Sequence, residues 1–377
     1  MKKKKKKVIL GLSGGVDSSV AAALLLKEGY DVEGVFMRNW DSATNLDLKG
    51  NPTAFNEICE QEIDYQDALK VANKLGIKLH KVDFVKEYWD EVFTYFLDEY
   101  KKNRTPNPDI LCNNEIKFKA FINHAKNFEY DYIAMGHYAK IDHSGDEPLL
   151  MRAKDQNKDQ TYFLSQLETE QLKDVLFPLG EIDKDEVRKI ALDLDLATAT
   201  KKDSTGICFI GERNFSEFLS NYLPAKKGDM RQLDGTFVKN HFGLMNYTIG
   251  QRKGLGIGGT QDSTEAWYVV GKDLTTNTLF VEPDKNHPHL FSNKAIITDI
   301  KFRGVKENKT LTAKFRYRQK DVPIQITWLD DTKALVEYTD VKAVTPGQAC
   351  VFYDGEVCLG SGFIDQVFYN EEERKYS

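Results

Sequence analysis

The stretch Gly11-Leu-Ser-Gly-Gly-Val-Asp-Ser-Ser19 decides the fold of this chain. It follows a short apolar run that starts at Val8, and a segment of helical character extends behind it as far as Lys27. Adjacent glycines let the backbone approach a ligand closely, and free N–H groups at a helix start favour an anion. The stretch therefore predicts a phosphate-binding turn between a strand and a helix. It lacks the Gly-Lys-Ser/Thr ending of a Walker A loop, so a lysine for the terminal phosphate is missing.

Strands and helices alternate outward from this turn. Apolar runs predict strands at 32–37, 78–84 and 132–135, and helical patterns lie at 64–75, 86–102, 113–126, 168–176 and 184–196. We expect Asp64 to cap the first of these helices and Gly76 to close it. The alternation is typical of a doubly wound, Rossmann-like parallel sheet, whose ligands bind at the carboxyl ends of the strands.

The character of the sequence changes after about residue 210. Short alternating segments at 295–300, 311–317, 324–328 and 349–353 are broken by Gly, Asn, Asp and Pro. This pattern predicts one or two small β-domains. We expect two mainly-β domains, the last of them a β-barrel. The expected division is a catalytic domain at 1–205, a small central domain at 206–282 and a barrel at 283–377.

Composition limits the classes of protein. The chain has 377 residues, 41% of them hydrophobic and 29% charged, with a net charge of −6. No run reaches the roughly 18 to 20 apolar residues that a membrane helix needs, so we expect a cytoplasmic protein without a membrane partner. Any nucleic acid must be held by local basic patches. The five cysteines form no CxxC pair, which disfavours a structural metal site, and none is predicted.

Two of the cysteines lie in stretches that suit thiolate chemistry. Cys112 follows a proline-bearing turn near a helix start, where backbone dipoles lower a thiol pKa, and Asp109 lies three residues before it. Cys208 follows Lys201 and Lys202 in a stretch of small residues. Each cysteine alone is more often an ordinary buried residue. Together with the phosphate-binding turn they indicate sulfur chemistry, in which one thiol would carry a persulfide and the other would release its sulfur.

The Ser13–Ser19 turn resembles the PP-loop of the N-type ATP pyrophosphatases, which cleave ATP between the α and β phosphates and adenylate a substrate oxygen. The resemblance implies ATP with Mg²⁺ as cofactor, and Asp17 as a residue that helps to position the ion. It also implies a phosphate site lined by Gly11, Leu12, Ser13, Gly14, Gly15, Val16, Asp17 and Ser18.

A closer resemblance covers almost the whole chain, from about Val8 to Phe363. The strings NPDILCN, MGHY, KDQTYFL, STGICFIGE and YTIGQRKGLGI are similar to those of the bacterial tRNA-specific 2-thiouridylases. That family sulfurates C2 of the wobble uridine in the anticodon stem-loop of tRNA, so the resemblance implies a tRNA substrate, a sulfur-donor or relay protein as partner, and a monomer.

The same resemblance assigns roles to particular residues. It implies that Cys112 is the nucleophile, Cys208 the persulfide-bearing cysteine and Asp109 the general acid/base, with a Cys112–Cys208 disulfide formed during the catalytic cycle. Further implied nucleotide contacts are Met37 and Gly136. The implied tRNA contacts are Asn107, Pro108, Asp109, Lys158, Asp159, Gln160, Arg316 and Tyr317.

Basic residues at every second position between Lys314 and Lys320 are a second feature that suits RNA binding. On a strand, Lys314, Arg316, Arg318 and Lys320 would share one face and could follow several phosphates, with Phe315 turned to the core. A solvated edge strand that blocks aggregation explains the row equally well, and the resemblance favours tRNA.

Three alternatives stay open from sequence. Another PP-loop enzyme, such as an amidating synthetase or a lysidine-type ligase, would need ATP but not both cysteines. An RNA-binding homologue without catalysis would need neither. Lastly, Asp109, Cys112 and Cys208 could ligate an iron–sulfur cluster. Cys59, Cys350 and Cys358 receive no role, and burial is expected for them.

Overall fold

The computed structural model describes residues 5–54, 56, 58–203, 206–258 and 266–376. The chain divides into two compact units. The first contains the chain up to Phe93, Pro108–Asn214 and Gly355–Leu359, and the second contains Thr94–Asn107, Phe215–Asp354 and Gly360–Ser377. No helix within the described ranges has the length and apolar character needed to cross a bilayer.

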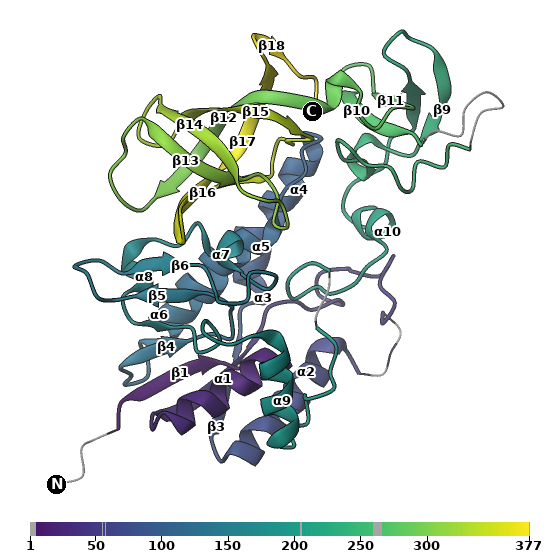
Figure 1. The fold of residues 1–377 in the computed structure, drawn as a ribbon. Coiled ribbons are helices and arrows are strands. Elements are labelled where there is room, and N and C mark those ends of the chain that lie inside the picture. The colour runs from purple at the N-terminus through teal and green to yellow at the C-terminus, as the bar shows by residue number, and fades with distance from the viewer. Residues whose placement is uncertain (1–4, 55, 57, 204–205, 259–265, 377) are drawn as a thin grey trace. The chain divides into compact units, whose positions relative to one another are not determined.

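A five-stranded parallel sheet forms the centre of the first unit (Figure 1). Its order is β3-β2-β1-β4-β7, so the order reverses at β1, as expected for a doubly wound sheet. Ligands of such sheets bind beside the strand at which the order reverses. The strands are β1 (Lys7–Gly11), β2 (Asp31–Arg38), β3 (Lys78–Asp83), β4 (Tyr132–Ala134) and β7 (Val175–Leu176).

Helices α1 (Val16–Lys27), α2 (Glu60–Leu75) and α9 (Lys184–Asp193) share one apolar core with the sheet. Val20, Ala68 and Val187, one from each helix, belong to this core. As predicted, Gly76 ends α2 in the left-handed conformation, at φ 69°. The predicted cap at Asp64 is wrong, because α2 begins four residues earlier.

Other helical stretches are broken into short elements. The predicted helix at 86–102 consists of α3 (Val85–Tyr88), the π-helix η1 (Trp89–Phe93) and α4 (Thr94–Lys101). The predicted helix at 113–126 starts earlier, as α5 (Pro108–Leu111), the π-helix η2 (Cys112–Ala120) and α6 (Phe121–Ala125). The remaining helices are α7 (Thr161–Leu164), α8 (Thr169–Leu172), α10 (Phe215–Leu219) and the short 3₁₀ turns η3 (Leu244–Asn246) and η4 (Pro288–Leu290).

The predicted helix at 168–176 is wrong in its second half. After α8, the chain forms β7, whose Val175 pairs with Ile133 of β4 and is buried. Pairing with the sheet outweighs the local helical pattern there.

A piece from near the C-terminus completes the first unit. Strands β5 (Lys140–Asp142) and β6 (Leu149–Met151) form a hairpin, and Val357 pairs with Met151. Next to this pair, the N–H of Arg152 donates to the carbonyl of Glu356 at 2.9 Å.

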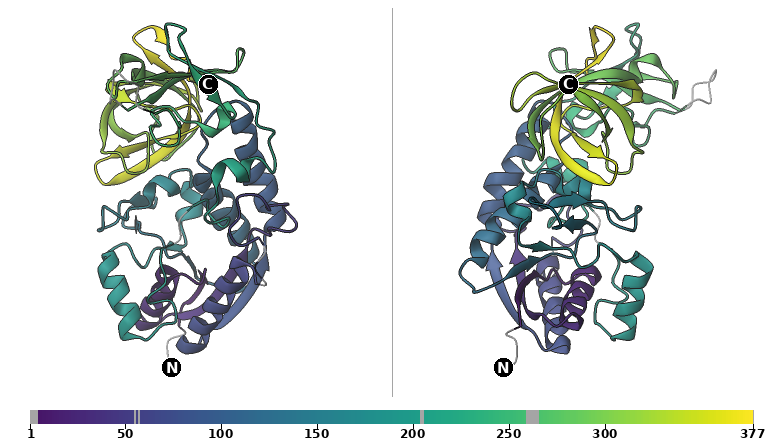
Figure 2. Two further views of the ribbon diagram at one scale, coloured as in Figure 1. Left: turned by 90° about the vertical axis from the view of Figure 1, so that its right-hand side faces the viewer. Right: turned by 60° about the vertical axis from the view of Figure 1, so that its left-hand side comes forward.

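The second unit contains two β-structures. A four-stranded sheet has the order β10-β11-β8-β9, and six further strands form a barrel that closes where β12 pairs with both β15 and β17 (Figure 2). The barrel confirms the predicted last fold element. The strands are β8 (Gly228–Arg231), β9 (Phe237–His241), β10 (Tyr268–Asp273), β11 (Thr278–Glu282), β12 (Phe291–Phe302), β13 (Lys309–Lys314), β14 (Val322–Trp328), β15 (Ala334–Lys342), β16 (Ala349–Asp354), β17 (Val357–Tyr369) and the short β18 (Glu372–Glu373).

The prediction of a basic strand face at 314–320 is wrong. Strand β13 ends at Lys314, and the N–H of Phe315 then donates to the side chain of Gln319 at 2.9 Å, which folds the chain into a turn. Arg316 and its basic neighbours in sequence therefore do not continue the strand. Phe315 itself is buried in the barrel core, as expected.

Candidate active site

The Gly11–Ser19 turn joins β1 to α1 in the predicted way. Gly14 has φ +75°, and a Cβ there would lie 2.1 Å from the carbonyl oxygen of Asp64, so only glycine fits. Gly15 caps α1 with extended backbone and no side chain. The first N–H groups of α1 are thus available for an anion.

The serine hydroxyls of the turn differ in what they contact. Ser13 is exposed, and its hydroxyl lies 3.1 Å from that of Ser18. Ser19 is fully buried; its hydroxyl donates to Gly15 O at 2.7 Å and accepts from Thr198 at 3.0 Å. The Ser19 hydroxyl therefore holds the turn together.

Three strand ends meet beside the turn. A Cβ on Gly11 would lie 2.5 Å from the sulfur of Met135 and 3.2 Å from the methyl of Met37, so both methionines pack on this glycine. A Cβ on Gly136 would lie 2.8 Å from the backbone N of Ser18. The structure thus brings Met37 and Gly136 to the turn, where the resemblance places nucleotide contacts.

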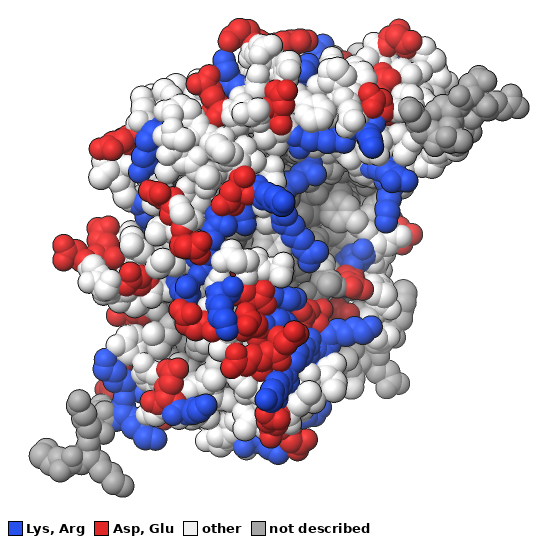
Figure 3. Space-filling model, viewed as in Figure 1, with Lys and Arg blue, Asp and Glu red and all other residues white. Residues whose placement is uncertain are grey.

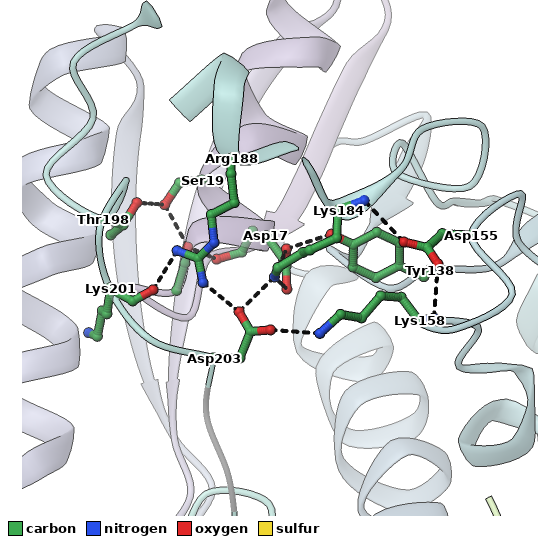
Figure 4. A network of polar contacts seen from close by, with 12 residues as sticks. Asp17, Ser19, Tyr138, Asp155, Lys158, Lys184, Arg188, Thr198, Lys201 and Asp203 are labelled. Carbon is green, nitrogen blue, oxygen red and sulfur yellow. Dashed lines mark hydrogen bonds and ion pairs between the residues drawn. The ribbon is translucent and has the colours of Figure 1, made fainter. Parts of the chain in front are cut away.

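A network of charged side chains lies against the turn (Figure 4). The ammonium of Lys184, from α9, is 2.7 and 2.9 Å from the carboxylate oxygens of Asp17, which also accepts from Tyr138 OH at 2.8 Å. Asp203 pairs with Lys184 at 2.8 Å, with Arg188 at 2.7 Å and with Lys158 at 2.8 Å. Partial burial works against its charge, but hydrogen bonds from these lysines lower the pKa of Asp203 to about 2.

The two predicted cysteines lie in contact. The sulfurs of Cys112 and Cys208 are 3.4 Å apart, and both are free thiols. A disulfide needs about 2.05 Å, so the structure holds the reduced pair close to bonding distance. The carboxylate of Asp109 accepts from the backbone N–H of Cys208 at 3.0 Å, which brings the third predicted catalytic residue to the same place.

A tight turn presents Cys208. Ile207 and Gly211 pair across it, and Phe209 adopts a left-handed φ of 65°. The hydroxyl of Tyr88 donates to the carbonyl of Cys208 at 2.8 Å. Both peptide groups of Cys208 are therefore held by side chains of the same unit.

The two thiols have opposite electrostatic environments. Burial raises the pKa of Cys112, whereas a hydrogen bond from Cys112 and the charge of Lys117 lower the pKa of Cys208. Although burial disfavours its charge, Lys117 has a raised pKa because Cys208, Cys112 and Asp109 are near. Cys208 is therefore the thiol that ionises more readily, and the expectation that the helix start lowers the pKa of Cys112 is wrong because burial outweighs it.

The π-helix η2 explains why Lys117 is near the thiols. Its N–H groups bond five residues back, as the Phe121 N–H does to Ile116 O, so residues five apart lie one turn above each other. In an α-helix a residue five positions on would point about 140° away. The π turn thus aligns Lys117 with Cys112, and the Lys117 ammonium lies 5.4 Å from the centroid of the Phe209 ring.

One hydrogen bond links the nucleotide turn to the cysteines. His137, next to Gly136, has its Nε2 3.0 Å from the side-chain oxygen of Asn113, the neighbour of Cys112. Burial lowers the pKa of His137, which favours a neutral ring. The residues that follow β4 therefore contact both the nucleotide turn and the segment that carries Cys112.

The predicted tRNA residues lie in varied settings. Asp159 is buried and accepts from Ala153 N–H at 2.8 Å and from Thr161 OH at 2.6 Å, so its side chain supports its own segment. Gln160 accepts from Tyr138 N–H at 2.9 Å, which ties this segment to the chain after β4. Arg316 is exposed but donates to Ala343 O at 2.8 Å. Acidic and basic side chains lie intermixed over the face in Figure 3.

Within the ranges that the structure describes, no group of three or more His, Cys, Asp and Glu side chains is placed to hold a metal ion. Asp109 turns an oxygen to the amide of Cys208, so the arrangement gives no support to the iron–sulfur alternative. Cys350 and Cys358 are buried as expected, but Cys59 is exposed.

Sequence reasoning missed Lys117, Lys184 and Tyr88. Lys184 is 167 residues away from Asp17 in the sequence, so only the fold brings the two together. Lys117 follows Cys112 by five residues and would point away from it in an α-helix. The five-residue spacing from Cys112 to Lys117 signals proximity only if a π-helix is known to be present.

The fold and the Gly11–Ser19 turn place this protein in the class of PP-loop nucleotide-binding proteins. The pair of thiols at Cys112 and Cys208 lies in the same unit. Family models match three parts of the chain: "tRNA methyl transferase HUP domain" at residues 6–212, "tRNA methyl transferase PRC-barrel domain" at 216–283 and "Aminomethyltransferase beta-barrel domain" at 292–364.

Curated relatives are similar over nearly the full length. The tRNA-specific 2-thiouridylase of Acholeplasma laidlawii (strain PG-8A) is 71% identical over 99% of this chain and 100% of its own length. That of Onion yellows phytoplasma (strain OY-M) is 59% identical over 98% and 100%, and one from Geobacillus kaustophilus (strain HTA426) is 59% identical over 97% and 96%. The chain belongs to the family of tRNA-specific 2-thiouridylases.

Proposed function

We propose that the protein is a sulfurtransferase that converts the wobble uridine (position 34) of tRNA to 2-thiouridine, using ATP and a persulfide on Cys208. The observation that carries the proposal is the 3.4 Å approach of the Cys112 and Cys208 thiols in the unit that also holds the Gly11–Ser19 turn. The names of the relatives, tRNA-specific 2-thiouridylases, support the substrate.

The first step activates the uridine. Its C2 carbonyl is a poor electrophile, so the C2 oxygen attacks the α-phosphate of ATP, forming a C2–O–AMP bond and releasing pyrophosphate. Gly11–Ser18, Met37 and Gly136 line the nucleotide site. Asp17 would help to hold a magnesium ion, which would neutralise charge on the phosphates.

The second step transfers sulfur. The terminal sulfur of the Cys208 persulfide adds to C2, and the Cys112 thiolate then attacks the Sγ of Cys208. The persulfide S–S bond breaks with its electron pair on the transferred sulfur, which forms the C=S bond as AMP leaves with the former C2 oxygen. A Cys112–Cys208 disulfide is left, and a thiol reductant restores the enzyme.

Asp109 acts as the general acid/base of this sequence. Burial raises the pKa of Asp109, although the Cys208 amide works in the opposite direction, and a raised pKa suits a carboxyl that carries a proton. Its contact with the Cys208 backbone places it beside the sulfur that changes protonation.

The tRNA binds with the uridine flipped out of the anticodon stack. The three family matches support a division into a catalytic domain at 1–205 and tRNA-binding domains at 206–282 and 283–377. The tRNA contacts are Asn107, Pro108, Asp109, Lys158, Asp159, Gln160, Arg316 and Tyr317. The enzyme acts as a cytoplasmic monomer that receives sulfur from a donor or relay protein.

Two measurements test the proposal. With α-labelled ATP, tRNA and a sulfur donor, the nucleotide product should be AMP, and formation of ADP would rule out adenylation. Mass spectrometry of tRNA nucleosides should show 2-thiouridine with the wild type and with Cys59→Ser, whose thiol is exposed. Cys208→Ser should form none; full activity of that variant would favour another PP-loop enzyme.

A further inference from the structure

Three cations converge beside the nucleotide turn. Lys184 and Arg188 both come from α9, one helical turn apart, and Lys158 comes from the segment before α7 (Figure 4). All three contact the single carboxylate of Asp203. The Lys184 side chain is only 11% exposed, so its position is set by its surroundings.

Lys184 reaches the turn itself. Its ammonium lies 2.7 Å from Asp17, which is part of the turn but 167 residues earlier in the chain. The turn carries no lysine between Gly11 and Ser19. A cation that a Walker A loop would supply from its own sequence is therefore present at this turn from another element.

The helix holds both cations in place. Val187 and Ala191 of α9 are buried in the core shared with α1. The Lys184 backbone N–H donates to Asp155 at 3.1 Å, and the Arg188 Nη1 donates to Ala199 O at 3.0 Å. The first contact fixes the Lys184 backbone. The second holds one side of the Arg188 guanidinium, whose Nη2 donates to Asp203 at 2.7 Å.

The charges do not balance around Asp203. Lys158, Lys184 and Arg188 bring three positive charges, whereas Asp203 and Asp17, which also pairs with Lys184, bring two negative charges. A terminal phosphate group offers three oxygens and up to two negative charges. A phosphate would therefore satisfy the same cations better than the carboxylate does.

We propose that Lys184 and Arg188 bind the phosphates of the nucleotide, and that Asp203 holds their charged ends in position until a phosphate replaces its carboxylate. This inference rests on the proposed use of ATP. In this inference Lys184 has the phosphate-binding role that a lysine within the loop has in Walker A proteins. Asp203 is then a competitor of the nucleotide and not one of its ligands.

Calorimetric binding of α,β-methylene-ATP with Mg²⁺ to the full-length protein tests the inference. Lys184→Gln should weaken binding by about 10- to 100-fold and Arg188→Gln by about tenfold, since each loses a charge-assisted hydrogen bond. Lys184→Arg keeps the charge and should bind better than Lys184→Gln. Lys189→Gln, on the same helix and exposed, is the matched control and should equal the wild type.

Asp203→Asn gives the decisive contrast. If Asp203 competes with phosphate, this variant should bind the analogue roughly three- to tenfold more tightly. If the network only fastens α9 to the turn, Asp203→Asn should bind no better than the wild type. Unchanged affinity in both Lys184→Gln and Arg188→Gln, or binding by Asp203→Asn that is no tighter than that of the wild type, overturns the inference.

The outcomes separate this inference from the proposed function. Should the wild type bind no analogue, the use of ATP itself is refuted. Should the wild type bind while the cation variants match Lys189→Gln, only the role of Lys184 and Arg188 is refuted. If Lys184→Gln does not fold, as judged by circular dichroism, Arg188→Gln and Asp203→Asn decide.

Discussion

Gly136 lies against the start of α1, and replacing it by alanine tests how the nucleotide turn is held. The added Cβ would lie 2.8 Å from the backbone N of Ser18, 2.9 Å from its Cα and 3.0 Å from the carbonyl carbon of Asp17. Ordinary contacts begin at 3.4 Å, so the end of β4 and the turn must separate by about 0.6 Å, the difference from 2.8 Å. The atoms met are backbone and cannot rotate away.

Overpacking of this kind costs about 1 to 3 kcal/mol. For a unit of this size, we expect the melting temperature to fall by roughly 2 to 10 °C. Displacement of the turn should also weaken binding of α,β-methylene-ATP by roughly tenfold, because sub-ångström positioning governs such contacts. Gly145→Ala is the control, since its Cβ would clash with nothing, the nearest atom being Glu147 O at 3.8 Å.

Thermal unfolding and calorimetry of the two variants separate the explanations. A loss of both stability and affinity in Gly136→Ala supports packing against the turn. A loss of affinity alone would indicate that the nucleotide touches Gly136 directly. If Gly136→Ala matches Gly145→Ala in both measurements, the reasoning from backbone contact is refuted.

Three further predictions follow from the same structure. Lys117→Met should raise the pKa of Cys208 and slow its alkylation by iodoacetamide at neutral pH by about tenfold, measured by mass spectrometry against pH; an unchanged midpoint contradicts this. Thr198→Val removes the buried hydrogen bond to Ser19 and should cost about 1 to 3 kcal/mol in urea unfolding, whereas a neutral effect would show that the bond is dispensable. Burial lowers the pKa of Lys272 from 10.5 to about 7, so the unfolded chain binds the extra proton between these values and stability should rise with pH there, by up to about 1.4 kcal/mol per unit. Lys272→Met should lose that slope in urea unfolding at pH 7 and pH 9, and an equal slope in both proteins would argue against a neutral buried amine.

The sequence predicted the parts of the site that a short string encodes. The Gly11–Ser19 turn, and Asp109 before Cys112, are local patterns whose residues also meet in space. The contact between Cys112 and Cys208 spans 96 positions, and the resemblance rather than any spacing paired them. The pairing by family likeness agrees with the 3.4 Å separation of the sulfurs.

Where prediction failed, tertiary contacts outweighed local pattern. The row after Lys314 has strand periodicity, yet the Phe315 N–H donates to the side-chain oxygen of Gln319 and the chain turns instead. Val175 follows a helical pattern but pairs with β4. No periodicity in the sequence distinguishes the π-helix η2 from an α-helix, so the position of Lys117 could not be foreseen.

The hairpin of β5 and β6 has a consequence for synthesis of the chain. Its neighbour Gly355–Leu359 belongs to the first unit, although about 140 residues of the second unit are made between it and Asn214. At about 5 to 20 residues per second, a ribosome needs roughly 7 to 28 s for that interval. During this time Met151 of β6 lacks its partner Val357, so the first unit is incomplete. A chain that stops before Gly355 would therefore lack Gly355–Leu359 of its first unit as well as β17 of its barrel. Completion of the first unit is thus tied to completion of the second.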